Sequence, residues 1–269
     1  MVIIGEKING SVGVVARAIA GRDEAVIRRL ALRQTELGAD YLDVAAGTSP
    51  EKERETLEWL IKIIQDTVDT PLCIDSPDPQ VLADILPLAN KPGILNSVSD
   101  ENGKCELIFP LAAETEWKII ALTCDNKGIS VAAGTRLGIA AAIIEKAAAF
   151  GITHERLFID PLITAVCTNE NSLSDFTGAL IMIKKRYPAV HVIGGLSNCS
   201  FGMPCRTLLN QHFLSLAMAA GLDSVIMDPV SVNIRSALYA ADALLGKDRN
   251  CRNFLSAYRK GLFKQWSVS

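Results

Sequence analysis

The sequence predicts an α/β protein in which eight parallel strands, each followed by a helix, close into one barrel. Three observations support this fold class. Short apolar segments rich in β-branched residues alternate with longer amphipathic segments, and strands that alternate with helices pair in parallel through right-handed crossovers. The alternation repeats eight times within 269 residues, close to the roughly 250 residues of such a barrel. No linker interrupts it, so we expect a single (β/α)8 TIM-barrel domain over residues 1–269.

The expected strands are nearly continuous in apolar residues, which is typical of strands that are buried on both faces. They are expected at residues 2–5, 40–45, 72–75, 93–96, 118–123, 157–160, 190–194 and 224–227. The expected helices carry apolar residues at helical spacing. They span residues 23–37, 79–88, 105–114, 135–150, 174–187, 206–220 and 232–245, with another beginning at residue 50 and a last one at 252–262, in a C-terminal helical segment at about 248–263.

Local signals mark the ends of some helices. Gly38 is expected to end the helix over 23–37, because glycine readily adopts the left-handed conformation that closes a helix. Ser49 is expected to cap the next helix, with Pro50 at its first position. The loop over 163–173 is long and polar, and loops of this kind on a barrel often act as lids or docking surfaces.

Composition and charge exclude several classes of function. The net charge is −3 with both signs interspersed, and no basic block suggests a nucleic-acid-binding surface. The apolar start of the chain is only four residues long before Glu6, which is too short for a signal peptide. No apolar stretch reaches the roughly 18 residues of a membrane span. We therefore expect a soluble, cytoplasmic protein that binds neither nucleic acid nor membrane.

The cysteines indicate reduced thiols more than a metal centre. There are seven of them, and no two have the Cys-x-x-Cys spacing. A metal site built from Cys199, Cys205 and His212 is the alternative, but its spacing matches no common zinc pattern. We expect no metal site.

Polar residues at the carboxyl ends of the expected strands form the candidate site, because barrel enzymes carry their chemistry at that face. Most are carboxylates and amides, and a hydrolase that uses divalent metals would be expected to add histidines, none of which closes a strand. The ring therefore suits a ligand rich in N–H donors. Its members are Glu6, Asp43, Asp75, Asn96, Thr123, Asp160, Asn198 and Asp228.

Each of these residues also has a purely structural alternative. An aspartate that follows a strand often caps the next helix or forms a turn, and Asp75, Asp160 and Asp228 each precede a proline by one or two residues. Asn96 and Asn198 are also candidates for holding turns or loops, and Glu6 for pairing with its neighbour in sequence, Lys7. The site interpretation depends on the same kind of side chain recurring at most of the eight ends.

Five sequence motifs together resemble the methyltetrahydrofolate–corrinoid methyltransferases. The match runs at near-constant spacing from the first strand to about Leu245. The motifs are Ile-Ile-Gly-Glu-Lys-Ile-Asn-Gly near the start, Cys73-Ile74-Asp75-Ser76, Leu95-Asn96-Ser97, Ile159-Asp160-Pro161-Leu162 and Gly195-Leu196-Ser197-Asn198-Cys199-Ser200.

The resemblance implies a pterin-binding barrel, usually a homodimer, that acts in one-carbon metabolism. It implies that Asp75, Asn96 and Asp160 bind the aminopyrimidinone edge of the pterin, and that Asn198 lies near N5 as the catalytic residue. Tetrahydrofolate or 5-methyltetrahydrofolate is then the substrate, and a separate corrinoid protein supplies the cobalamin. Further candidates near the site are Glu6, Asp43, Ser197, Arg206 and Asp228.

The implied reaction moves a methyl group from a methylated corrinoid to N5 of tetrahydrofolate. Stand-alone methylcorrinoid:tetrahydrofolate methyltransferases of anaerobic methylotrophic catabolism, of the glycine betaine type, are the nearest match. The reverse reaction, from methyltetrahydrofolate to a corrinoid iron-sulfur protein, is the first alternative. Phe201 stands where the acetogenic members of the family have a polar residue. A dihydropteroate synthase-like enzyme is a more distant alternative, because those enzymes have Asn-Val-Thr-Pro-Asp-Ser-Phe where this chain has Asn9-Gly10-Ser11-Val12, and they carry a late basic motif.

Overall fold

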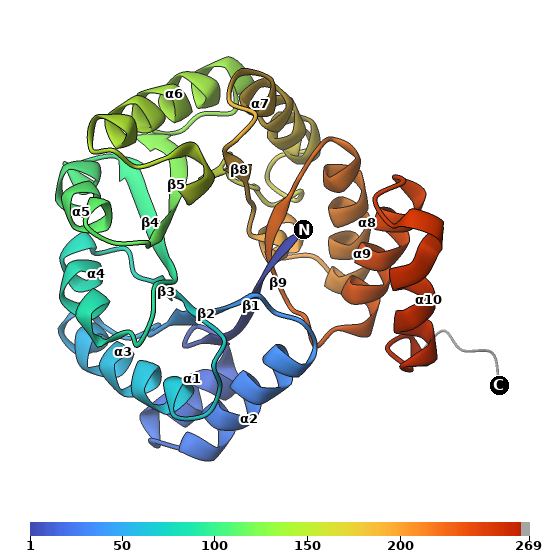
Figure 1. The fold of residues 1–269 in the computed structure, drawn as a ribbon, viewed down its shortest axis with the longest axis horizontal. Coiled ribbons are helices and arrows are strands. Elements are labelled where there is room, and N and C mark those ends of the chain that lie inside the picture. Colours follow the sequence, from blue (N-terminus) through green and yellow to red (C-terminus); the bar gives the residue numbers. More distant parts are fainter. Residues whose placement is uncertain (265–269) are drawn as a thin grey trace.

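The computed structural model describes residues 1–264 and confirms the barrel (Figure 1). Within this range, eight strands pair in parallel in the order β8-β7-β5-β4-β3-β2-β1-β9. The ring closes between its two edge strands, where Gly195 forms a parallel bridge with Ile226 and the Ile226 N–H donates to the Gly194 carbonyl at 3.1 Å. The strands are β1 (Val2–Asn9), β2 (Tyr41–Ala45), β3 (Leu72–Asp75), β4 (Ile94–Asp100), β5 (Lys118–Asp125), β7 (Leu157–Asp160), β8 (His191–Val192) and β9 (Ser224–Met227).

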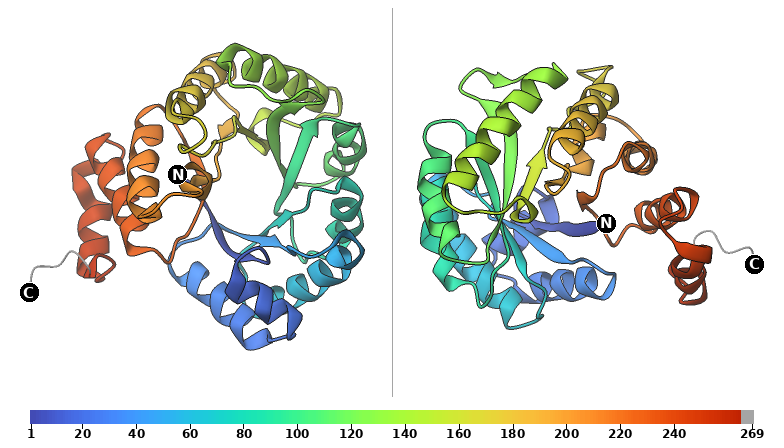
Figure 2. Two further views of the ribbon diagram at one scale, coloured as in Figure 1. Left: turned by 180° about the vertical axis from the view of Figure 1, so that it is seen from behind. Right: turned by 45° about the horizontal axis from the view of Figure 1, so that its top comes forward.

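Helices surround the strands, and the last one stands outside the ring beside α9 (Figures 1 and 2). In the described range none of them is long and apolar enough to cross a membrane. The helices are α1 (Gly13–Ala20), α2 (Glu24–Glu36), α3 (Pro50–Gln65), α4 (Pro79–Ile85), α5 (Lys104–Ala113), α6 (Ala133–Ala149), α7 (Ser172–Arg186), α8 (Arg206–Ala219), α9 (Val232–Leu244) and α10 (Arg252–Arg259).

Side-chain caps begin two of the early helices. Asp23 accepts from the N–H groups of Ala25 and Val26 at the start of α2, which satisfies donors that have no partner within the helix. Asp78 does the same for Gln80 at the start of α4, at 2.8 Å. Ser49 occupies the N-cap position of α3, with Pro50 in the first turn, as predicted, but its side chain makes no capping hydrogen bond.

The core has two layers, one outside the strands and one inside the barrel. The outer layer is the large cluster between strands and helices, where for example Ile27 of α2, Leu60 of α3 and Val44 of β2 are fully buried. The inner layer fills the barrel below its mouth. It comes from different strands and consists of Ile4, Cys73, Ile94, Ile120, Phe158 and Ile193, all fully buried.

Several predicted boundaries are wrong. Strand β1 continues to Asn9, so Glu6 lies within the strand, and Asp43 and Thr123 also lie within β2 and β5. Among the α-helices and strands of the described residues, two were not predicted, the two-turn helix α1 and the short strand β6 (Gly128–Ile129), which pairs antiparallel with β5. Each is too short to show a hydrophobic period in sequence. Strand β8 is shorter than predicted.

The C-terminal segment divides into two helices. A 3-10 turn, η4 (Arg249–Cys251), precedes α10, which ends at Arg259 and so three residues before its predicted end. Gly246 and Gly261 have positive φ near the ends of α9 and α10, a conformation that glycine adopts without a Cβ clash.

Candidate active site

A polar cleft of about 410 Å3 opens at the carboxyl ends of the strands. This volume lies in the range typical of small-molecule sites. Seven of the predicted site residues line it, and they come from five strands and from the 3-10 helix η3 (Leu196–Ser200). Those seven are Glu6, Asp43, Asp75, Asn96, Asp160, Ser197 and Asn198.

The two-residue period of a strand explains why these side chains converge. Residues i and i+2 of a strand point to the same face. Moving two residues from the apolar layer inside the barrel toward each strand's carboxyl end therefore leads to a side chain at the mouth. Ile4 leads to Glu6, and Cys73 to Asp75. In the same way the other inner residues lead to Asn96, Leu122, Asp160 and Gly195, and every residue reached lines the cleft.

Asp43 on β2 and Asn96 on β4 form a buried polar pair in front of β3, the strand between them. Asn96 Nδ2 donates to Asp43 Oδ1 at 3.3 Å, and the two residues are 9% and 3% exposed. Burial raises the pKa of Asp43 well above its ordinary value, and the nearby Asp75 carboxylate raises it further. Burial also raises the pKa of Asp75 to about 6, with a smaller contribution from the charge of Glu53. Burial and the neighbouring carboxylate thus both favour the protonated form of Asp43 on this side of the cleft.

Asp160 lies on the opposite part of the ring, at the end of β7. Its Oδ1 accepts from the backbone N–H of Leu162 at 2.7 Å, so the turn that follows the strand orients the carboxylate. Leu162 itself has φ +70°, which is unusual for a residue with a Cβ. Burial raises the pKa of Asp160 to about 7, while the Leu162 N–H and the charge of Arg136 act in the opposite direction. Asp160 therefore both accepts a hydrogen bond within the turn after β7 and lines the cleft, so its structural and its site interpretation are compatible.

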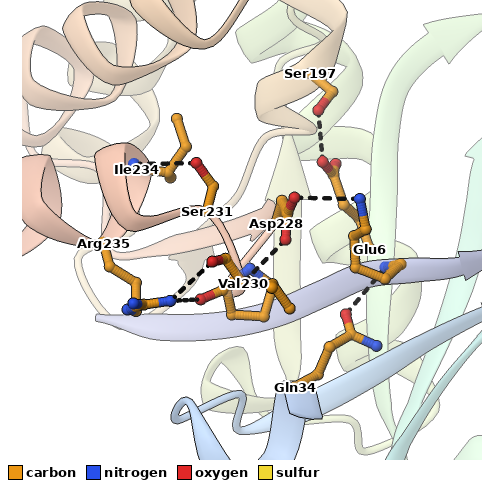
Figure 3. A network of polar contacts seen from close by, with 10 residues as sticks. Glu6, Gln34, Ser197, Asp228, Val230, Ser231, Ile234 and Arg235 are labelled. Atoms are coloured by element: carbon orange, nitrogen blue, oxygen red, sulfur yellow. Dashed lines mark hydrogen bonds and ion pairs between the residues drawn. The ribbon is translucent and has the colours of Figure 1, made fainter. Parts of the chain in front are cut away.

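Glu6 forms its hydrogen bond with η3, and its neighbour in sequence, Lys7, forms an ion pair with Asp228 (Figure 3). Ser197 Oγ donates to Glu6 Oε1 at 2.6 Å, and burial raises the pKa of Glu6 even though this hydrogen bond lowers it. Lys7 Nζ lies 3.2 Å from Asp228 Oδ2, and the other oxygen of Asp228 accepts from the Val230 N–H at 2.8 Å. The alternative in which Glu6 pairs with Lys7 is therefore wrong.

Asn198 presents its amide to the cleft from η3. It is exposed, and the glycine at position 195 leaves room for its side chain, since a Cβ built there would lie 3.0 Å from Asn198 Nδ2. Arg206 stabilises η3, because its Nη2 donates to the Ser197 carbonyl at 2.7 Å and its Nε to Ser200 Oγ at 3.1 Å. The carboxyl end of the barrel thus holds an amide in place without covering it.

Three predicted site residues, Thr123, Arg206 and Asp228, do not line the cleft, and some residues that line it were missed. Thr123 is fully buried within β5. Arg206 acts through η3, and Asp228 forms a turn and pairs with Lys7. Asp75, by contrast, makes no cap, since Asp78 fills that role. The missed polar residues are Asn9, Ser76, Ser97 and Lys104. Asn9 lies at the end of β1, hidden because the strand was predicted to stop at residue 5, and Lys104 begins α5 with no sequence signal for this position.

The described residues offer no metal centre. Among residues 1–264, no group of three histidine, cysteine or acidic side chains is placed to hold a metal ion. The alternative site from Cys199, Cys205 and His212 does not form: Cys199 is buried and its thiol donates to Asn210 Oδ1 at 3.3 Å, whereas Cys205 is exposed. The polar groups that the cleft presents are mainly carboxyls, amides and hydroxyls.

Comparison with known proteins identifies the family. A model described as pterin binding enzyme matches residues 15–228. A methylcorrinoid:tetrahydrofolate methyltransferase of Eubacterium limosum is 46% identical over 263 residues, 97% of each chain. Methionine synthase of Mycobacterium leprae is 29% identical over 240 residues, which are 84% of this chain and 20% of that one.

Solved structures agree on the fold. Dihydropteroate synthase of Xanthomonas albilineans with 4-aminobenzoic acid has a TM-score of 0.69 at 22% identity, covering 90% of this chain and 92% of that chain. A Yersinia pestis enzyme of the same name, with a pterine-sulfa conjugate, has a TM-score of 0.68 at 17% identity, covering 91% and 93%. At such identities the likeness shows the barrel alone. Together with the family match and the full-length relative, it establishes that the chain belongs to the pterin-binding enzymes.

Proposed function

We propose that this protein is a methyltransferase that moves a methyl group from a methylated corrinoid to N5 of tetrahydrofolate. The observation that carries the proposal is the convergence of Asp75, Asn96, Asp160 and Asn198 on one cleft at the barrel mouth. The full-length relative, named for this reaction and 46% identical, supports the same conclusion.

The cleft suits the aminopyrimidinone edge of a pterin. That edge presents an exocyclic amine and a ring N–H, and an ionised carboxylate accepts two such hydrogen bonds side by side. Asp75 and Asp160 supply carboxylates, and Asn96 supplies an amide that is already oriented by its bond to Asp43. The apolar layer below them closes the barrel, so a flat ring rests at the mouth and not deeper.

Asn198 is the proposed catalytic residue. The N5 lone pair attacks the methyl carbon in line, the electron pair of the broken cobalt–carbon bond stays with the corrinoid, and N5 loses its proton. An amide can either donate to N5 or accept from it as its protonation changes, so it stabilises the developing charge. No covalent enzyme intermediate is needed, and holding the two reactants in line accounts for several kcal/mol of the barrier, on the order of effects seen for positioned reactions.

The corrinoid is a second substrate that a separate corrinoid protein presents. The open mouth favours this arrangement, because Asn198 is exposed and Phe201, at the end of η3, is 70% exposed beside it. We further propose that the protein acts in the cytoplasm as a homodimer. The reverse direction, from methyltetrahydrofolate to the corrinoid, uses the same groups and remains the second candidate.

An anoxic assay tests the function. Purified protein is mixed with methylcobalamin and tetrahydrofolate, and the cobalamin spectrum is followed together with the appearance of 5-methyltetrahydrofolate. Conversion of the methylcobalamin with equal formation of methylated folate is expected. A folded protein that binds folate and gives no conversion in either direction, even at high concentration, contradicts the proposal.

The same preparation tests the more distant alternative. Incubation with a pterin pyrophosphate and p-aminobenzoate is expected to give no dihydropteroate. Formation of that product would assign the chain to a condensing synthase in place of a methyltransferase.

A further inference from the structure

Arg136 is the largest side chain that the fold buries completely, and its guanidinium is only partly satisfied. It is 0% exposed, and its Nε donates to the Ser130 carbonyl at 2.6 Å. Nη1 and Nη2 have no hydrogen-bond partner in the described part of the chain. Burying charged donors without acceptors costs folding free energy. A group kept under these conditions points to a role other than stability.

Arg136 does not line the cleft. It belongs to the first turn of α6, a helix that packs against β5 and α7. The neighbour of β5 in the barrel is β7, which ends in Asp160. The positive charge of Arg136 opposes the rise that burial causes in the pKa of Asp160, so the two groups are close enough to act on each other.

The other charged groups around Asp160 do not replace this cation. From α7, Asp175 faces Arg136 and accepts from Asn169 Nδ2 at 2.9 Å. From β5, Lys118 lies at the amino end of the barrel, where its Nζ donates to Tyr41 at 2.7 Å.

On the other flank, His191 of β8 stacks on Phe158, and its Nδ1 lies 3.5 Å from Asp223. At the mouth, Asp125 ends β5 and accepts from the Lys127 N–H at 2.8 Å. Lys104 lines the cleft and lies 3.7 Å from Glu101.

Apart from Lys104, the charged residues that line the cleft with Asp160 are acidic, namely Glu6, Asp43 and Asp75. Without a nearby positive charge, burial and the neighbouring carboxyl groups favour the protonated form of Asp160. A protonated carboxyl has one oxygen fewer to accept with, and its O–H faces the N–H groups of the pterin edge.

We propose that Arg136 is a positioning residue that acts through Asp160: its buried positive charge keeps the Asp160 carboxylate ionised, so that the carboxylate can accept two hydrogen bonds from the pterin. The proposal rests on the function proposed above, because it takes a pterin as the ligand of Asp160. It assigns to a residue outside the cleft the control of the pH range in which folate binds.

The test is the affinity for tetrahydrofolate as a function of pH, measured anaerobically by calorimetry. In the wild-type protein the affinity is expected to rise with pH through about pH 7, where the Asp160 pKa lies, and then to level off. Arg136→Met is expected to move this midpoint up by about one pH unit, which lowers the affinity about fivefold at pH 7 and has little effect well above it. Arg136→Lys keeps the charge and is expected to keep the midpoint near its wild-type position.

Arg156 provides the matched control. It precedes the same strand, β7, at the opposite end, and its guanidinium donates to the carbonyls of Ala112 and Trp117. Arg156→Met is expected to lower thermal stability without moving the midpoint. Arg136→Met, which removes donors that have no partner, is expected to unfold at a temperature equal to or above that of the wild type.

The results distinguish failure of the role proposed for Arg136 from failure of the proposed function. An unchanged midpoint in Arg136→Met overturns the role of Arg136, while folate binding by the wild type leaves the proposed function standing. If the wild type binds no tetrahydrofolate at any pH, the proposed function itself fails. Should Arg136→Met not fold, Asp175→Asn serves instead: it removes a negative charge from the same cluster and keeps an oxygen for Asn169, so the midpoint is expected to fall, and no fall counts against the proposal.

Discussion

Asn96 on β4 donates a hydrogen bond to Asp43 on β2 at 3.3 Å, across β3, which lies between them. The bond joins two buried polar side chains and fixes the orientation of the Asn96 amide. Burial and the nearby Asp75 carboxylate raise the pKa of Asp43, and the hydrogen bond from Asn96 acts in the opposite direction. Three predictions about the cleft follow from such local contacts, and a fourth concerns η3.

Asp43→Asn is expected to stabilise the protein at neutral pH. Burial raises the pKa of Asp43, so the folded state disfavours its ionised form. The penalty is absent below the unfolded-state pKa of about 4 and grows as the pH rises above it. The variant, which cannot ionise, is expected to unfold about 3–6 °C above the wild type at pH 7.5, with the difference shrinking toward about pH 4. Thermal unfolding at several pH values measures this.

The control for that series is Asp66→Asn, at the exposed C-terminus of α3. A pH-dependent gain of the same size in this exposed variant would show that the effect of Asp43→Asn does not depend on burial. A pH-independent difference for Asp43→Asn would show that the Asp43 carboxyl is ionised in the folded protein.

Asp160→Asn is expected to separate stability from binding. Since burial raises the pKa of Asp160 to about 7, the amide removes a penalty that develops between about pH 4 and pH 7, and the variant is expected to be more stable at pH 8. Tetrahydrofolate affinity is expected to fall about tenfold to a hundredfold, because an amide accepts one pterin N–H and turns its own donors toward the other. Calorimetric titration measures the affinity.

Asp125→Asn is the matched control at the end of the next strand, β5, outside the cleft. Its folate affinity is expected to equal that of the wild type. Loss of affinity in both variants would mean that the effect is not specific to the cleft.

Asn198→Ala is expected to lower methyl transfer far more than folate binding. The amide is exposed on η3 and its proposed partner, N5, gains or loses charge during transfer. Removing one group that stabilises such charge typically lowers the rate about a hundredfold or more. Single-turnover transfer from methylcobalamin gives the rate, and titration with folate gives the affinity. Equal losses in both would assign Asn198 to binding.

Gly195→Ala is expected to impair transfer by displacing the Asn198 amide, since the added Cβ would lie 3.0 Å from Asn198 Nδ2. The rate is expected to fall about tenfold, in line with the sensitivity of catalysis to displacement of a positioned group. Gly138→Ala in α6 is the control: nothing lies within 4 Å of its Cβ, and alanine stabilises a helix interior by about 0.5–1 kcal/mol. A Gly195→Ala protein with full activity contradicts the positioning role of this glycine.

Much of the fold was predictable because it follows from local chemistry. The alternation of strands and helices predicted all eight parallel strands, and the polar residues at the carboxyl ends of those strands predicted most of the side chains that meet at the mouth. Asp75, Asn96 and Asp160 each lie two residues beyond an inner apolar residue, so their sequence position alone placed them correctly.

The errors have physical causes as well. The polar pair Glu6 and Lys7 interrupts the apolar run of β1, yet the strand continues to Asn9 with a shift in register, so the end of β1 was misplaced and Asn9 was missed. Asp228 and Arg206 were predicted near the ligand, but their contacts to Lys7 and to the η3 backbone depend on tertiary geometry that no local pattern contains. The same holds for Arg136, whose burial follows from the packing of α6 against its neighbours.

A crystal structure of the protein with tetrahydrofolate tests the central claim most directly. We predict that the pterin edge lies within hydrogen-bond distance of Asp75, Asn96 and Asp160, with N5 directed toward the amide of Asn198. A folate bound elsewhere on the molecule, or one in this cleft with N5 turned away from Asn198, would contradict the account.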